Sequence, residues 1–62
     1  MELRQRILKT LKEKGILATY QLRILADAGY SKTFNEELDK LVKEGKVEKI
    51  VVNKGTYWEL IE

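Results

Sequence analysis

The sequence TYQLRILADAGYSKTFNEELDKLVKEGKVEKI, residues 19–50, decides the fold. Apolar residues recur every three or four positions on both sides of Gly29, which is the spacing of one face of an α-helix. After Gly45 the pattern changes to closely spaced β-branched residues, which is typical of a β-strand. This stretch therefore predicts two helices joined by a tight turn, followed by a strand.

The first of these helices is predicted to begin at Thr19, because a threonine hydroxyl is a good N-cap. It is predicted to end at Gly29, since glycine is common just past a helix terminus. Leu22, Leu25 and Ala28 share one face of this helix, and we expect that face to point into the core.

The second helix is predicted over residues 31–44, with Ser31 or Thr33 as its N-cap and with Thr33 and Glu36 matching a capping box. Four apolar residues share its inner face: Phe34, Leu38, Leu41 and Val42. Five charged residues lie opposite them: Lys32, Glu36, Asp39, Lys40 and Lys43. The pattern is that of a helix with one buried face and one solvated face.

The residues before Thr19 add a third helix and a short extended segment. One helical stripe of apolar residues precedes Gly15: Leu3, Ile7, Leu8 and Leu11. Gly15 follows a cationic last turn and is well placed to end that helix. Residues 16–18 are too few for a helix, so we expect an extended link or a very short strand there.

The residues after Gly45 predict a β-hairpin. Residues 47–52 and 56–61 are rich in β-branched and aromatic side chains, and Asn53-Lys54-Gly55 between them is a turn signal. In this prediction four residues face the core: Ile50, Val52, Trp58 and Leu60. Glu48 does not fit that register, because it falls on the same face as Ile50 and Val52.

Composition limits the kinds of protein that this chain can be. Sixty-two residues suit one small domain, predicted over residues 1–62. The chain has no cysteine and no histidine, which excludes disulfides, thiolate chemistry and the common zinc sites. No apolar run approaches the roughly 18 residues of a membrane span, so we expect a soluble cytoplasmic protein. Few Asn and Gln beside many Lys and Glu fit a thermophilic origin.

Positive charge is concentrated in the amino-terminal part of the chain. Residues 1–26 contain six Lys/Arg and two acidic residues, whereas residues 27–62 contain six Lys/Arg and eight acidic residues. The overall net charge of +2 is too small to identify a partner by itself. The basic half is therefore the amino-terminal one.

The order helix, short strand, helix, tight turn, helix, hairpin resembles the winged helix-turn-helix superfamily. The segment S-K-T-F-x-x-x-L-x-x-L-V-x-x-G-x-V, residues 31–47, is similar to the third helix and first wing strand of small bacterial and archaeal regulators. Trp58-x-Leu60 matches the aromatic-x-Leu that closes the wing in that superfamily. The resemblance implies an α+β fold with three helices and a C-terminal hairpin wing, and a transcriptional regulator that binds double-stranded DNA.

Enzymatic activity is not expected. The single serine and the four threonines have no plausible base beside them in the sequence, and histidine is absent. The carboxylates Glu36, Glu37 and Asp39 are predicted on or beside a solvated helix face, where their pKa values would not be tuned for acid–base catalysis. No glycine-rich phosphate loop is present. We therefore expect no cofactor, no metal and no small-molecule substrate.

In the superfamily that the chain resembles, the third helix enters the major groove with its amino-terminal residues toward the bases. The matching base-reading residues in this chain are Lys32, Thr33, Asn35, Glu36 and Lys40. Their side chains suit the task, because Lys can bind guanine, Asn adenine, Glu cytosine and Thr a thymine methyl group. Predicted phosphate contacts come from seven residues: Thr19, Tyr20, Arg23, Ser31, Lys43, Asn53 and Lys54.

Two interpretations of the helix over residues 31–44 stay open. Glu36 precedes Lys40 by four residues and Asp39 precedes Lys43 by four, which is the pairing pattern of any solvated helix. Three acids also balance three lysines between Lys32 and Lys43, so this helix alone has no net attraction for phosphate. The alternative function is a protein-interaction domain that docks through this helix or the wing without binding DNA.

A homodimer is the last expectation from the sequence. Regulators that bind palindromic sites usually do so as dimers. Any dimer of this domain would have to use the first helix or the edge of the hairpin.

Overall fold

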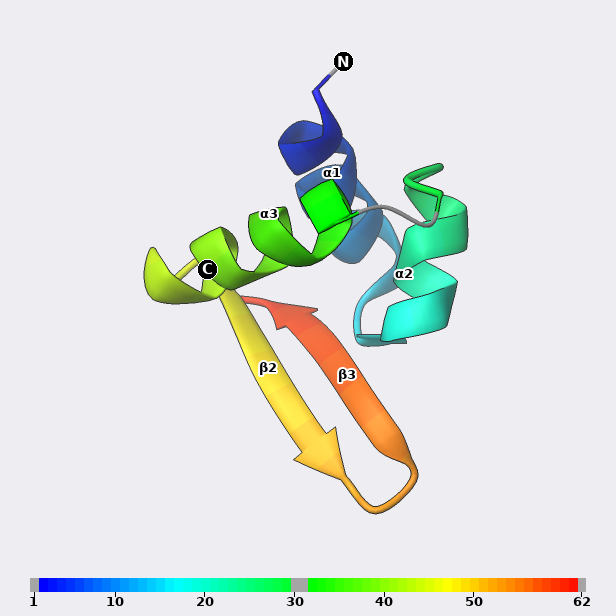
Figure 1. The fold of residues 1–62 in the computed structure, drawn as a ribbon. Helices are drawn as coiled ribbons and strands as arrows, with labels where there is room; N and C mark the ends of the chain where they lie inside the picture. Colours follow the sequence, from blue (N-terminus) through cyan, green and yellow to red (C-terminus); the bar gives the residue numbers. More distant parts are fainter. Residues whose placement is uncertain (1, 30–31, 62) are drawn as a thin grey trace.

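Six regular elements follow one another in the predicted order. The computed structural model describes residues 2–29 and 32–61. The elements are α1 (Leu3–Lys14), β1 (Leu17–Ala18), α2 (Thr19–Leu25), α3 (Lys32–Lys43), β2 (Val47–Val52) and β3 (Gly55–Leu60). Figure 1 shows the hairpin of β2 and β3 projecting away from the three helices. The prediction of three helices with a C-terminal hairpin is confirmed.

The three strands form one antiparallel sheet in the order β1-β3-β2. Trp58 of β3 is paired with Lys49 of β2 on one side and with Leu17 of β1 on the other. The short strand expected around residues 16–18 is therefore real, and it ties the start of α2 to the hairpin. Strand β2 lies at the edge of the sheet.

One core joins the helices to the base of the hairpin. Its fully buried side chains are Ile7 and Leu11 of α1, Leu22 of α2, Phe34, Leu38 and Leu41 of α3, and Val47 of β2. Trp58 of β3 is 5% exposed and packs in the same cluster. Helices α1 and α3 bury the apolar stripes that the sequence predicted, so burial of these stripes sets which face of each of these two helices remains in solvent.

Helix α2 is shorter than predicted and turns a different face inward. It ends at Leu25 instead of Gly29, because Asp27 adopts a left-handed conformation with φ of 54° that breaks the helix. Leu22 and Ala26 are buried, whereas Leu25 is 49% exposed. The prediction that Leu25 faces the core is wrong, since the buried stripe follows the i,i+4 pair 22 and 26.

The predicted helix caps are also corrected. Thr19 is the first helical residue of α2, and the residue before it is the N-cap. The side-chain amide oxygen of Gln21, Oε1, accepts a hydrogen bond from the Ala18 backbone N–H at 3.3 Å. Helix α3 begins at Lys32, so Thr33 is inside the helix and does not form a capping box with Glu36. The alternative cap, Ser31, lies outside the described residues.

The hairpin register differs from the prediction by one residue on β2. Val47 is opposite Leu60 and Lys49 is opposite Trp58, so Ile50 and Val52 lie on the outer face. Val52 is 47% exposed, whereas Val47 is only 1% exposed. A shift of one residue moves every side chain of a strand to the other face. Glu48, the residue that did not fit, is consequently placed in solvent.

Lys49 occupies the core side of β2 without being buried. Its ammonium lies 5.8 Å from the centroid of the Trp58 ring, within reach of a cation–π interaction. Because a lysine occupies this core-side position, the alternation of apolar residues in the sequence predicted the wrong face of β2. Val47 fixes it instead, because it directly follows the turn that ends α3.

An ion pair joins the beginning of α1 to the end of α3. The Arg4 guanidinium donates hydrogen bonds to both carboxylate oxygens of Glu44, one of them at 2.9 Å. Both side chains are partly exposed, at 26% and 41%. This bond holds the pKa of Glu44 below its usual value, chiefly through the hydrogen bonds with Arg4.

The lowered pKa of Glu44 makes part of the stability depend on pH. A depressed carboxyl pKa in the folded state adds stability above the unfolded-state pKa, and that stability is lost as the pH falls through the folded-state value. We expect Glu44→Gln to lower the melting temperature at pH 7, with the difference from wild type disappearing in acid. Glu13→Gln, which changes an exposed carboxylate on α1, is the control. Thermal unfolding of the three proteins over a pH series is the measurement; a constant difference at every pH would contradict the assignment.

Candidate nucleic-acid interface

The outer face of α3 is exposed along its whole length. All five predicted base-reading residues are on this helix and exposed: Lys32, Thr33, Asn35, Glu36 and Lys40. At 100° per residue, Lys32, Glu36 and Lys43 point in nearly the same direction, and Asn35 lies toward the edge beside Val42. Because Phe34, Leu38 and Leu41 are buried on the other side, the helix presents this face as a rigid ridge.

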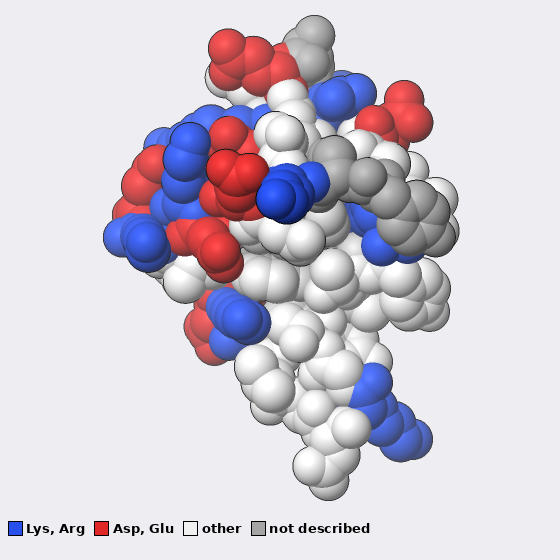
Figure 2. All heavy atoms as spheres, in the orientation of Figure 1, with Lys and Arg blue, Asp and Glu red and all other residues white. Residues whose placement is uncertain are grey.

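Charges of both signs alternate on this ridge. The Lys40 ammonium is 3.9 Å from a carboxylate oxygen of Glu37, one turn earlier in the helix. Figure 2 shows acidic and basic groups intermingled over α3, and a largely uncharged surface over the wing below it. The ridge thus offers donors and acceptors for recognition but little net charge for attraction.

The predicted phosphate-binding residues with described positions lie on α2, at the end of α3 and at the tip of the wing. Tyr20 is 58% exposed in the first turn of α2, and Lys43 is exposed at the last residue of α3. Arg23 is partly buried and lines a shallow hollow with Ile24, Asp27 and Gly29. Ser31 lies outside the described residues.

The tip of the wing is a two-residue turn. Val52 is paired with Gly55, so Asn53 and Lys54 form the turn and both side chains are exposed. Gly55 has φ of 146°, a value that favours glycine, which explains its place directly after the turn. Lys54 is therefore at the end of the hairpin that lies farthest from α3.

Thr19 has a structural contact that the sequence did not reveal. The Trp58 indole N–H donates a hydrogen bond to the Thr19 hydroxyl at 2.7 Å, and that hydroxyl donates to the Thr56 carbonyl at 3.3 Å. The side chain predicted to cap α2 and bind phosphate is thus engaged with β3. The signal that could have found this contact is the single tryptophan, because a buried indole N–H needs an acceptor.

Exposed apolar side chains near the wing tip and on α2 were also missed. Val51 is 69% exposed next to Val52 on β2, and Ile24 is 66% exposed one turn after Tyr20 on α2. Val51 is on the same face of β2 as Val47 and Lys49 but is exposed, opposite Thr56 near the tip of the hairpin. Apolar groups at a wing tip can contact sugar or a thymine methyl as readily as a protein.

Two further findings concern metals and membranes. Within residues 2–29 and 32–61, no group of three or more potential ligands from Asp and Glu could hold a metal ion. In the same part of the chain, every helix is too short or too polar to cross a bilayer.

The three helices and the antiparallel hairpin define a winged helix-turn-helix domain. The chain is similar to the crystal structure of a transcriptional regulator of the MarR family from Silicibacter pomeroyi, with a TM-score of 0.87 and 27% identity. The similarity covers 95% of this chain and 40% of the regulator, so the chain spans about two fifths of the regulator's length. No protein-family model and no curated protein matches the chain.

The contact of Thr19 with Trp58 yields a stability prediction. Thr19→Val keeps the size of the side chain but removes the acceptor, and a buried indole N–H left unpaired costs about 1–3 kcal/mol. Thr19→Ser retains the hydroxyl and should lose much less. Urea unfolding, followed by the fluorescence of the single tryptophan, measures both variants. Equal losses in the valine and serine variants would contradict a role for the hydroxyl.

Proposed function

We propose that this domain binds double-stranded DNA as a small, non-enzymatic transcriptional regulator, with α3 in the major groove and the hairpin tip on the backbone or in the minor groove. The observation that supports it best is the similarity, over 95% of the chain, to a transcriptional regulator. The exposed outer face of α3 adds a physical reason, because an isolated ridge about 10–12 Å across fits the major groove.

Base contacts in this proposal come from the first half of α3. Lys32, Thr33 and Asn35 are in the first turn, where side chains of a recognition helix reach base edges. Glu36 and Lys40 follow on the exposed face one and two turns later. Lys32 would donate to guanine, Asn35 would bind adenine, and Glu36 would accept from cytosine.

Phosphate contacts in this proposal come from the rims of the ridge. Tyr20 and Arg23 approach from α2, Lys43 from the end of α3, and Asn53 and Lys54 from the wing tip. The backbone at Thr19 and Ser31 could contribute N–H groups, although the Thr19 hydroxyl is already engaged with β3. Because few of these phosphate-contacting residues are lysines, we expect one domain to bind DNA with modest affinity. A homodimer through α1 or the free edge of β2 would raise that affinity.

Substitution of two lysines tests the proposal. We expect Lys32→Ala and Lys54→Ala each to weaken binding of a mixed-sequence duplex. Lys54→Ala should do so to a similar extent on all sequences and should reduce the salt dependence by about one phosphate contact. Lys14→Ala, on the last turn of α1 and outside the proposed interface, is the matched control. Fluorescence anisotropy over a salt series gives affinity and slope together.

Two results would contradict the proposal. One is wild-type affinity that does not change with salt, because phosphate neutralisation requires a steep dependence. The other is an equal effect of the three lysine substitutions. Salt-independent binding of a protein partner through α3 or the wing would favour the alternative, a domain that docks on proteins without binding DNA.

A further inference from the structure

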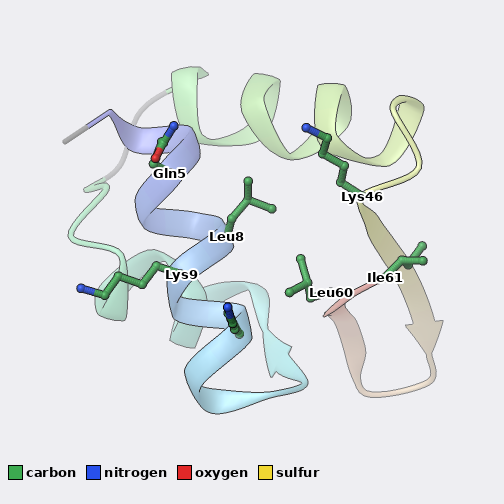
Figure 3. Close-up of a pocket in the computed structure, with 7 residues that line it drawn as sticks. Gln5, Leu8, Lys9, Lys46, Leu60 and Ile61 are labelled. Carbon is green, nitrogen blue, oxygen red and sulfur yellow. The ribbon is translucent and has the colours of Figure 1, made fainter.

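An open groove runs between α1 and the end of β3. Leu8 of α1 and Leu60 of β3 form its floor, and their side chains are directed toward one another across it (Figure 3). Lys46, from the turn before β2, lines the groove on its α3 side, with its side chain directed toward α3 (Figure 3), and Ile61 follows Leu60 in the lining. The volume is about 510 Å³.

A second hollow continues the groove along α1. It has a volume of about 430 Å³ and shares Lys12 and Leu60 with the first. Together the two hollows extend from Gln5 to Gly15 on the α1 side. Ten residues of helix at 1.5 Å each make this groove about 15 Å long, which is the length of roughly ten residues of a second helix.

The rim of the groove is cationic. Lys12 lies on its α1 side and forms no ion pair with any described residue, whereas the Lys9 side chain extends from α1 away from Leu8 and Leu60 (Figure 3). Lys46 is 3.9 Å from Glu44, a carboxylate that Arg4 already binds. The only acid lining either hollow among the described residues is Glu59, at the Gly15 end.

We propose that this groove binds an acidic amphipathic helix of a partner protein. Its length exceeds that of a compact small molecule and suits two to three turns of helix. An apolar side chain of the partner would occupy the space between Leu8 and Leu60, as in other helix-in-groove complexes. Carboxylates one turn away on either side would meet Lys12 and Lys46.

The same charges disfavour the other occupants. A two-fold contact between copies through this groove would bring two copies of Lys12 and Lys46 into one interface, and like charges across an interface are costly. Duplex DNA would cover the apolar floor with phosphates and leave it without a partner. An acidic amphipathic helix would place apolar side chains on the floor and carboxylates beside the lysines of the rim. This proposal does not depend on the DNA proposal.

The test is an NMR titration of the isotope-labelled domain with a synthetic helical peptide of about 15 residues, long enough to fill the groove, with leucines along one face and glutamates flanking them. We expect shifts concentrated at Leu8, Lys12, Lys46, Leu60 and Ile61. A peptide of the same composition, scrambled so that the leucines no longer share a face, should bind at least about tenfold more weakly, a difference of 1.4 kcal/mol.

Two variants and one control locate the site. Lys12→Glu should bind the peptide at least about tenfold more weakly, while Lys14→Glu, the same change outside the groove, should bind as wild type does. Ile61→Ser removes a 45% exposed apolar group without adding charge and should also weaken binding, which keeps the test valid if the Lys12 variant is unstable.

Several outcomes would overturn the proposal. They are the absence of shifts at millimolar peptide, shifts located on α3 or the wing tip, and equal binding of the scrambled peptide. Shifts of the groove residues by a mixed-sequence duplex, with none by the peptide, would identify a nucleic-acid surface instead.

Discussion

Trp58 joins the parts of this small fold. Its backbone pairs with β1 on one side and β2 on the other, its ring is buried in the helical core, and its indole N–H is bound to Thr19 at the start of α2. Lys49 lies over the same ring. A chain of 62 residues has few buried side chains, so a residue that makes this many contacts contributes strongly to the orientation of the hairpin relative to α2.

This junction also determines what the domain can present to a partner. Packing of Phe34, Leu38 and Leu41 on the core leaves the charged face of α3 outward, while Trp58 sets the direction in which the wing projects. The proposed DNA contacts therefore lie on α3 and the hairpin, with further phosphate contacts from α2. The positively charged groove along α1 is lined by a different set of residues, so binding of an acidic helix there is compatible with binding of DNA at α3.

Much of the fold could be predicted from the sequence because its signals are periodic. The stripes of α1 and α3 lie where predicted, since each is a run of leucine-type residues ended by glycine. The details that failed depend on tertiary contacts. The register of β2 follows from burial of Val47 and from the position of Lys49 over Trp58. Helix α2 ends at Leu25 because Asp27 adopts a left-handed conformation, which the local sequence did not predict. The candidate DNA residues lie on exposed surfaces, with three exceptions: Thr19, whose hydroxyl is bound to β3, Arg23, which is partly buried, and Ser31, which lies outside the described residues.

The central claim, that α3 and the wing tip together bind duplex DNA, is tested most directly by mapping backbone amide shifts of the labelled domain during titration with a mixed-sequence duplex at low salt. The account predicts the largest shifts between Lys32 and Lys43 and at Asn53 and Lys54, decreasing as salt is added. A titration that leaves both segments unshifted would contradict it.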